Sequence, residues 1–352
     1  MVCDCGGGTV DLTTRTLLPD NQLGEITERS GDLCGSTFVD NEFFLFLSRR
    51  LGFSAMQNFK EKHYGQYQYL ILSFFCPRVK FVFEGDATKF QPIELDIERI
   101  CPALIEYVEE DIKEQMADEE WLLEFQYKDV KSMFDPVVEQ IIRLIRNQLT
   151  ASQQKCSAIF VVGGFAESPY LISRIKKSFG REIRTITLPQ QPITAVLLGA
   201  VQYGLNKKVI KTRRVPLTYG IEVCPLWKDG IDPKNRKTAT GRILKFAEIV
   251  QRGTESPPDR KFSEDFIPIY ENQKLITFKI FATKERQAEY CDELGMKQIA
   301  TLTIRLGNEE LGLRRPVEFG LTFAEEEIRA TAWNKITGET IETCFEYAES
   351  II

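Results

Sequence analysis

"DCGGGTVDLTT", residues 4–14, places three consecutive glycines between two short stretches in which apolar and polar residues alternate. Asp4 precedes the Gly6–Gly8 run, and Thr9 and Asp11 follow it. Because glycine has no Cβ, such a turn lets backbone N–H groups converge on one point and lets an anion approach them closely. The segment therefore predicts two strands joined by a phosphate-binding turn, with a tight hairpin turn and solvated carboxylates as the alternative.

Asp4 would stand at the end of the first strand, beside a phosphate held by this turn. A carboxylate in that position can hold the water shell of a Mg²⁺ ion or orient an attacking water molecule, and the Thr9 hydroxyl can donate to the same anion. The sequence contains neither the P-loop pattern GxxxxGK[ST] nor the dinucleotide pattern GxGxxG. We therefore predict a phosphate site of another kind, in which Asp4 meets the metal only through water.

A second glycine turn lies in "AIFVVGGFAESPYLISRI", residues 158–175. Its pattern predicts a buried strand, a turn at Gly163–Gly164, and a helix capped by Ser168 with Pro169 behind the cap. A glycine pair lets a flat group such as adenine with its ribose pass close to the backbone, although close helix packing is the commoner explanation of such a pair when it is taken alone. Two such turns on strands of one α/β domain imply a nucleotide held from both ends.

Two elements near these turns can be bounded from local signals. Alternating residues predict one strand over Val10–Leu18. Asp135 is a good N-cap residue, Pro136 fits the first helical position, and apolar residues follow at helical spacing. We therefore expect a helix from Asp135 to about Leu149.

A basic run at residues 207–214 separates two regions of different texture. Residues 1–206 alternate predicted strands and helices around a less regular inserted subdomain at 41–134, whereas the segments after the basic run alternate apolar and polar residues with a period of two. We predict an α/β domain over 1–206, a solvated linker over 207–214, and an antiparallel β-sandwich without a helical lid over 215–348.

Composition narrows the class of protein. The 352 residues carry 45 Lys and Arg against 51 Asp and Glu, a net charge of −6, which gives no overall attraction to nucleic acid. No apolar run approaches the ~20 residues that cross a bilayer, so we expect no membrane span. Nine cysteines without a CxxC pair favour a reducing compartment, the cytoplasm or the nucleus. His63 is the only histidine, so a site built from several histidines is excluded.

The ordered set of motifs resembles the heat-shock protein 70 family of the actin-like ATPase superfamily, in a divergent form. "DCGGGTVD" (4–11) resembles the family's second phosphate motif and "FVVGGFAESPYL" (160–171) its adenosine motif. "QPITAVLLGAVQYG" (191–204) is similar to the second connecting helix, and "LTYGIEV" (217–223) to the start of the substrate sandwich. The resemblance implies the second, ribonuclease H-like lobe of an actin-like ATPase, followed by an all-β sandwich like the chaperone substrate-binding domain.

The resemblance also implies roles for single residues. Asp4 would be the metal-water or catalytic-water carboxylate, Asp11 a secondary carboxylate, and Gly6–Thr9 the phosphate cradle. Adenosine would be lined by four residues: Gly163, Gly164, Phe165 and Lys80. The implied cofactor is ATP or ADP with Mg²⁺.

Two departures from the family pattern shape the functional expectation. Ile193 stands where the family has an acidic residue beside the ribose. The resemblance also begins at the second lobe, so we expect an N-terminally incomplete protein that lacks half of the catalytic groups, binds ATP weakly, and does not hydrolyse it appreciably by itself. The helix Ile193–Leu205 would then expose an apolar patch, so we expect either that the sequence is truncated upstream or that a partner supplying the missing lobe covers this patch.

The function expected from this resemblance is that of a divergent chaperone, active in protein folding and the stress response, whose sandwich binds unfolded or extended peptide segments. A nucleotide-independent interaction scaffold that keeps the fold is the first alternative. A sugar or acetate kinase of the same superfamily is the second.

Overall fold

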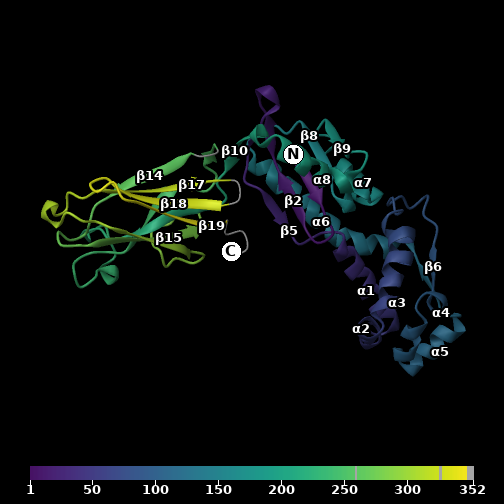
Figure 1. Cartoon of the computed structure of the whole chain (residues 1–352). Coiled ribbons are helices and arrows are strands. Elements are labelled where there is room, and N and C mark those ends of the chain that lie inside the picture. The colour runs from purple at the N-terminus through teal and green to yellow at the C-terminus, as the bar shows by residue number, and fades with distance from the viewer. Residues whose placement is uncertain (258–259, 325–326, 347–352) are drawn as a thin grey trace. The chain divides into compact units, whose positions relative to one another are not determined.

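The computed structural model describes residues 1–257, 260–324 and 327–346 (Figure 1). The chain divides into two compact units. One consists of Met1–Thr14 with Arg29–Lys207, and the other of Arg15–Glu28 with the chain from Lys208 onward. Within the described ranges, no helix combines the length and the apolar character that crossing a bilayer requires.

A five-stranded mixed sheet, in the order β5-β2-β1-β8-β9, organises the first unit. Its strands are β1 (Val2–Cys5), β2 (Val10–Thr13), β5 (Ser30–Asp32), β8 (Ala158–Val162) and β9 (Thr185–Thr187). β2 runs antiparallel to β1, and β8 runs parallel to it. Alternation places Cys3, Cys5, Val10 and Leu12 in the core, as expected for a strand pair with one buried face.

The first unit also has four longer helices, which are α1 (Thr37–Leu51), α6 (Tyr127–Ala151), α7 (Pro169–Phe179) and α8 (Ala195–Leu205). α6 packs on β2, β5, α1 and α7. The Ser168 hydroxyl accepts a hydrogen bond from the Leu171 N–H, so the predicted cap of α7 is present. Short 3₁₀ turns precede α7 and α8, at Gly164–Glu167 and Pro192–Thr194.

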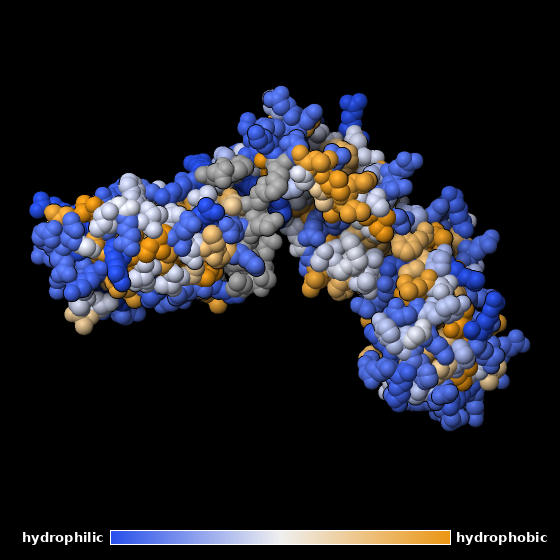
Figure 2. Space-filling model, in the orientation of Figure 1, coloured by the Kyte–Doolittle hydropathy of each residue, from blue (hydrophilic) through white to orange (hydrophobic). Residues whose placement is uncertain are grey.

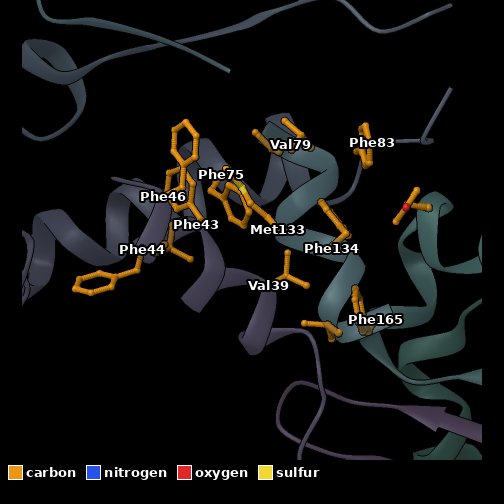
Figure 3. Packing of buried hydrophobic residues seen from close by; sticks show 14 of the residues in the cluster. Val39, Phe43, Phe44, Phe46, Phe75, Val79, Phe83, Met133, Phe134 and Phe165 are labelled. Atoms are coloured by element: carbon orange, nitrogen blue, oxygen red, sulfur yellow. The ribbon is translucent and has the colours of Figure 1, made fainter. Parts of the chain in front are cut away.

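The segment between α1 and α6 adds eight short elements. They are α2 (Phe53–Lys62), α3 (Tyr64–Tyr69), a π-helix (Leu70–Lys80), β6 (Ile93–Asp96), α4 (Ile97–Ile100), a 3₁₀ helix (Pro102–Tyr107), α5 (Glu110–Asp118) and β7 (Leu122–Phe125). Phenylalanines join this segment to α1 and α6 in one core (Figure 3). The Phe43 and Phe75 rings, for example, stack with their centroids 4.1 Å apart.

Two predicted boundaries in this unit are wrong. α6 begins at Tyr127 rather than at Asp135, because the Gln126 N–H donates to the Asp129 carboxylate at 2.9 Å and caps the helix earlier. Val130 and Met133 extend the buried side of the helix toward its start. This packing compensates for the backbone hydrogen bond that Pro136 cannot donate. The segment predicted as one strand over Val10–Leu18 forms two strands: β2 ends at Thr13, and a second strand covers Arg15–Leu17.

The second unit contains two four-stranded antiparallel sheets with one shared core. One sheet has the order β12-β11-β15-β16, with bounds Lys245–Val250, Thr218–Val223, Leu275–Thr283 and Lys297–Arg305. The other has the order β14-β17-β18-β19, with bounds Lys261–Phe266, Val317–Phe323, Glu327–Asn334 and Thr340–Glu346. Phe278 of β15 lies against Phe319 of β17 with ring centroids 4.8 Å apart, so the sheets pack face to face.

A further small sheet, with the order β13-β10-β4-β3, belongs to the second unit. The predicted domain boundary is wrong here, because the sheet includes residues from 15–28, which were predicted to lie in the first domain. Its strands are β3 (Arg15–Leu17), β4 (Leu23–Glu25), β10 (Ile210–Arg214) and β13 (Glu255–Ser256). The segment predicted as a solvated linker over 207–214 contains β10, which pairs with β4. Glu25 is buried there and accepts hydrogen bonds from the Arg15 guanidinium at 3.1 Å and the Arg214 N–H at 2.9 Å.

Candidate nucleotide-binding site

The glycine turn between β1 and β2 is closed by a hydrogen bond from the Gly6 N–H to the Thr9 carbonyl, at 2.9 Å. All three glycine carbonyls accept hydrogen bonds from the segment that leads into α1: Ser36 N–H to Gly6, Thr37 N–H to Gly7 and Gly35 N–H to Gly8, at 3.0, 2.8 and 3.1 Å. The turn therefore caps the start of α1, which has no side-chain cap of its own.

This arrangement fixes the direction of the turn's N–H groups. In a planar trans peptide, the N–H of one residue points opposite to the C=O of the residue before it. Because the three carbonyls face the segment 35–37, the N–H groups of Gly7, Gly8 and Thr9 point away from it. In the described chain none of these three N–H groups has an acceptor, and all three residues are exposed. They form the kind of amide concavity that binds anions.

Close approach, rather than a left-handed backbone, explains the glycines. None of Gly6–Gly8 has φ in the left-handed region. A Cβ on Gly8 would meet nothing within 4 Å, so its open side is free for a ligand. A Cβ on Gly35 would lie 2.3 Å from the Gly7 carbonyl oxygen, so glycine is required at position 35 to bring the two segments together.

The two aspartates of the opening motif face each other across the strand pair, because Asp4 and Asp11 are register partners. Burial, and then the charge of Asp11, raises the pKa of Asp4. Among the described residues no group donates a hydrogen bond to Asp4. The Thr9 hydroxyl, predicted to donate to the phosphate, donates instead to Asp11 at 2.9 Å. Asp4 is thus a half-buried carboxylate without a counter-charge, which fits a hydrated cation.

The second glycine turn lies beside the first. β8 is parallel to β1 with Val162 opposite Asp4, so Gly163 follows at the same edge of the sheet. A Cβ on Gly163 would lie 2.6 Å from the Asp4 carboxylate and 2.4 Å from the Cys5 carbonyl oxygen, and its φ is +85°. Only glycine fits this position without strain. The structure therefore brings together Asp4, the Gly6–Thr9 turn and the Gly163–Gly164 turn.

Comparison with known proteins identifies the family. No family model matches the chain. Proteins similar to it over 99% of its length include heat shock 70 kDa protein 12A of Mus musculus at 27% identity and of Homo sapiens at 26%, and heat shock 70 kDa protein 12B of Homo sapiens at 24%. These similarities support a divergent member of the heat shock protein 70 family.

The similarity to other members of the heat shock protein 70 family is more limited. The chaperone protein DnaK of Thermotoga petrophila is 23% identical over 38% of the chain. The chain itself spans about half, 54%, of the length of the 12A and 12B relatives that it matches. Similarity to this family suggests an actin-like ATPase fold of mixed sheets and helices, and binding of ATP or ADP with Mg²⁺ is a general property of the family.

Two residues that the resemblance places beside adenosine have buried side chains. Phe165 is 0% exposed and packs in the core with Val39 and Phe134, so its side chain does not line a surface site (Figure 3). Lys80 is buried, and its ammonium group donates to the Asp40 carboxylate at 2.7 Å. Lys80 ends an 11-residue π-helix that contains Pro77, where the 3.6-residue period cannot indicate which side chains face outward.

Ile193 occupies the space next to the second turn. Its Cδ1 is the atom closest to a Cβ built on Gly164, at 3.7 Å, and its side chain is 63% exposed. The Pro192 carbonyl accepts a hydrogen bond from the Gly163 N–H at 2.9 Å, which holds this segment against the turn. The surface beside Gly164 is therefore apolar.

Gly35 and the segment 35–37 are the functional residues that the sequence analysis missed. The only available signal was the glycine in "GDLCGS", residues 31–36. Its role depends on contact with residues about 28 positions earlier in the chain, at Gly7, and local sequence patterns do not report such contacts.

The raised pKa of Asp4 gives a testable pH dependence. Because the folded state favours protonated Asp4, this group's contribution to stability is fully present at low pH and is lost as the pH rises through the folded-state pKa. Asp4→Asn should therefore raise the free energy of unfolding at neutral pH. The gain should shrink when urea unfolding is repeated near about pH 3, below the ordinary Asp pKa of about 3.9, where most of the carboxyl group is protonated in both the folded and the unfolded state. An Asp4→Asn variant that is destabilised equally at both pH values would contradict this assignment.

Proposed function

We propose that the chain acts as a divergent chaperone of the heat shock protein 70 type, with a weak Mg·ATP site at the two glycine turns and a peptide-binding β-sandwich. The observation that carries the nucleotide part is the set of outward N–H groups on Gly7, Gly8 and Thr9 beside the unpaired Asp4 carboxylate. In this proposal the first unit corresponds to the second lobe of an actin-like ATPase. The two antiparallel sheets correspond to the substrate-binding domain.

Each part of the site has a defined role in this proposal. The three N–H groups would hold phosphate oxygens, and Asp4 would hold the water shell of Mg²⁺, which neutralises phosphate charge when bound. Asp11 holds the Thr9 hydroxyl and adds negative charge beside Asp4. Rapid phosphoryl transfer needs further donors around the developing charge. We therefore propose that these residues alone bind ATP without hydrolysing it appreciably.

The peptide site is proposed at the end of the sandwich where the loops 224–244 and 267–274 meet. Arg242 ties them by donating to the Cys224 carbonyl at 2.8 Å and to the Ile269 carbonyl at 3.2 Å. Ile267 and Tyr270 are exposed beside this link. An exposed apolar surface with ordered loop backbone around it suits an extended apolar peptide, which needs apolar contacts and main-chain hydrogen bonds.

The apolar surface of α8 supports a partner for the first unit. No residue of α8 is buried, and the segment 191–206 carries no charged residue. Figure 2 shows the resulting apolar patch, which is formed by Ile193, Val196, Leu197, Leu198, Val201 and Leu205. A helix that is apolar on all sides is normally covered. We propose that a partner lobe with an apolar surface, completing the ATPase fold, covers it.

The nucleotide-independent scaffold is the second candidate function. It is favoured by the burial of Phe165 in the core and by the ion pair of Lys80 with Asp40. The apolar Ile193 beside Gly164 favours it as well. The kinase alternative is set aside, because the relatives belong to the heat shock protein 70 family.

Calorimetric titration with Mg·ATP separates the chaperone-like site from the scaffold. We expect weak binding that is lost in Asp4→Asn, because this change removes the carboxylate that holds the water shell of the metal. Binding should also be lost in Gly7→Val, because a branched side chain pressed against Thr37 displaces the turn. Gly65→Val is the matched control, since a Cβ on Gly65 in α3 meets nothing within 4 Å. Absence of binding by the unaltered chain would favour the scaffold.

Peptide binding can be followed by the fluorescence anisotropy of a labelled extended apolar peptide. Ile267→Asp should weaken binding by about tenfold or more, which corresponds to about 1.4 kcal/mol, because it places a charge in the apolar contact. Leu294→Asp is the control, since Leu294 is 99% exposed on a different loop of the same unit. Equal effects of the two changes would contradict the proposed location.

The patch on α8 can be tested with a dye that fluoresces on exposed apolar surfaces. Changing Leu197 and Leu198 together to Ser should remove most of the dye fluorescence of the isolated chain, whereas Leu294→Ser should leave it unchanged. Fluorescence that is low in the unaltered chain would show that α8 is already covered and would contradict the proposal.

A further inference from the structure

We propose that the glycine-turn site recognises its ligand by the phosphate groups alone, so that Mg²⁺ complexes of different nucleoside triphosphates and of inorganic tripolyphosphate bind about equally well. This inference rests on the proposed nucleotide site and specifies its ligand class, which is a polyphosphate chain. The base and ribose attached to that chain are not recognised. Two parts of the site support it: the first glycine turn, called the phosphate side, and the residues expected to contact adenosine, called the organic side.

The phosphate side is built and held in place. Three carbonyls of the turn are fixed by the segment 35–37, and a fourth hydrogen bond, from the Gly6 N–H to the Thr9 carbonyl, closes the turn. The N–H groups of Gly7, Gly8 and Thr9 therefore do not need to reorganise to meet an anion, which lowers the cost of binding. The open side of Gly8 leaves room for phosphate oxygens.

The organic side offers no polar side chain at the positions expected to contact adenosine. Phe165 lies in the core, and the Lys80 ammonium group is taken by Asp40. Ile193 presents a hydrocarbon surface beside Gly164. The next hydroxyl along the chain, on Thr194, donates to the Gln191 carbonyl at 3.2 Å and so bonds within its own turn.

These contacts decide how strongly one base can be preferred. Discrimination by a large factor requires buried polar groups that are left unpaired by the wrong ligand, whereas an apolar contact distinguishes similar groups only weakly. Adenine and guanine have similar flat faces and differ in their hydrogen-bonding edges. A surface made of Ile193 and the Gly163–Gly164 backbone would contact either face equally and would not read the edges.

The test is calorimetric titration of the whole chain with Mg·ATP, Mg·GTP and Mg·tripolyphosphate. We expect dissociation constants that agree within about threefold, less than 1 kcal/mol. Gly8→Ala should weaken all three alike, because its methyl group occupies the anion side, and Gly65→Ala should leave all three unchanged. An unfolding temperature of Gly8→Ala equal to that of the unaltered chain would establish that this change does not act through misfolding.

A gain-of-specificity variant provides the second arm. Ile193→Asn places a neutral hydrogen-bond acceptor beside Gly164, where it can accept from a ribose hydroxyl, so ATP and GTP should gain affinity relative to tripolyphosphate. A preference of the unaltered chain for ATP by about tenfold or more over both other ligands would overturn this inference and leave the proposed nucleotide site standing. No binding of any of the three would overturn both.

Discussion

The site depends on the hydrogen bonds between the carbonyls of Gly6–Gly8 and the N–H groups of residues 35–37. These bonds satisfy groups on both sides: the turn gains partners for its carbonyls, and α1 gains acceptors for its first N–H groups. Their geometric consequence is that the N–H groups on the other side of the same peptides face outward. The start of α1 thus orients the N–H groups of the turn toward the outside of the unit.

The pairing of β1 with β8 is the second constraint. With Asp4 opposite Val162, the turn that follows β8 must pass within van der Waals contact of the Asp4 carboxylate, which only Gly163 allows. This places a carboxylate, an amide concavity and a close backbone turn at one edge of one sheet. The burial that raises the pKa of Asp4 follows from the same packing, so an uncompensated charge is built into the site.

The sequence was sufficient to predict features with strong local signals. The glycine turns, the Ser168 cap and the alternating strands of the second unit were foreseen because each follows from a few adjacent residues. The start of α6 was not, because the apolar stripe around Val130 and Met133 overrides the cap-like Asp135 and Pro136. The burial of the Phe165 and Lys80 side chains was not foreseen, because a family position indicates which residue aligns. Side-chain direction depends on the local backbone, including the π-helix that ends at Lys80.

The grouping of Arg15–Glu28 with the second unit also lay beyond local patterns. It depends on β4 pairing with β10, which is separated from it by more than half of the chain, and on the buried Glu25 that accepts from Arg15 and Arg214. The residues 207–214 look like a solvated basic linker by composition, because five of them are Lys or Arg. Strand pairing with a distant hairpin is the information that composition lacks.

The central claim is that the outward N–H groups of the first glycine turn contact the phosphate groups of a bound ligand. The most direct measurement is the NMR spectrum of the chain labelled with ¹⁵N-glycine, recorded during titration with Mg·ATP. The account predicts that the amide signals of Gly7 and Gly8 shift with a single saturable dependence, while those of Gly65 and Gly338 stay in place. Saturable shifts confined to glycines outside the two turns would contradict it.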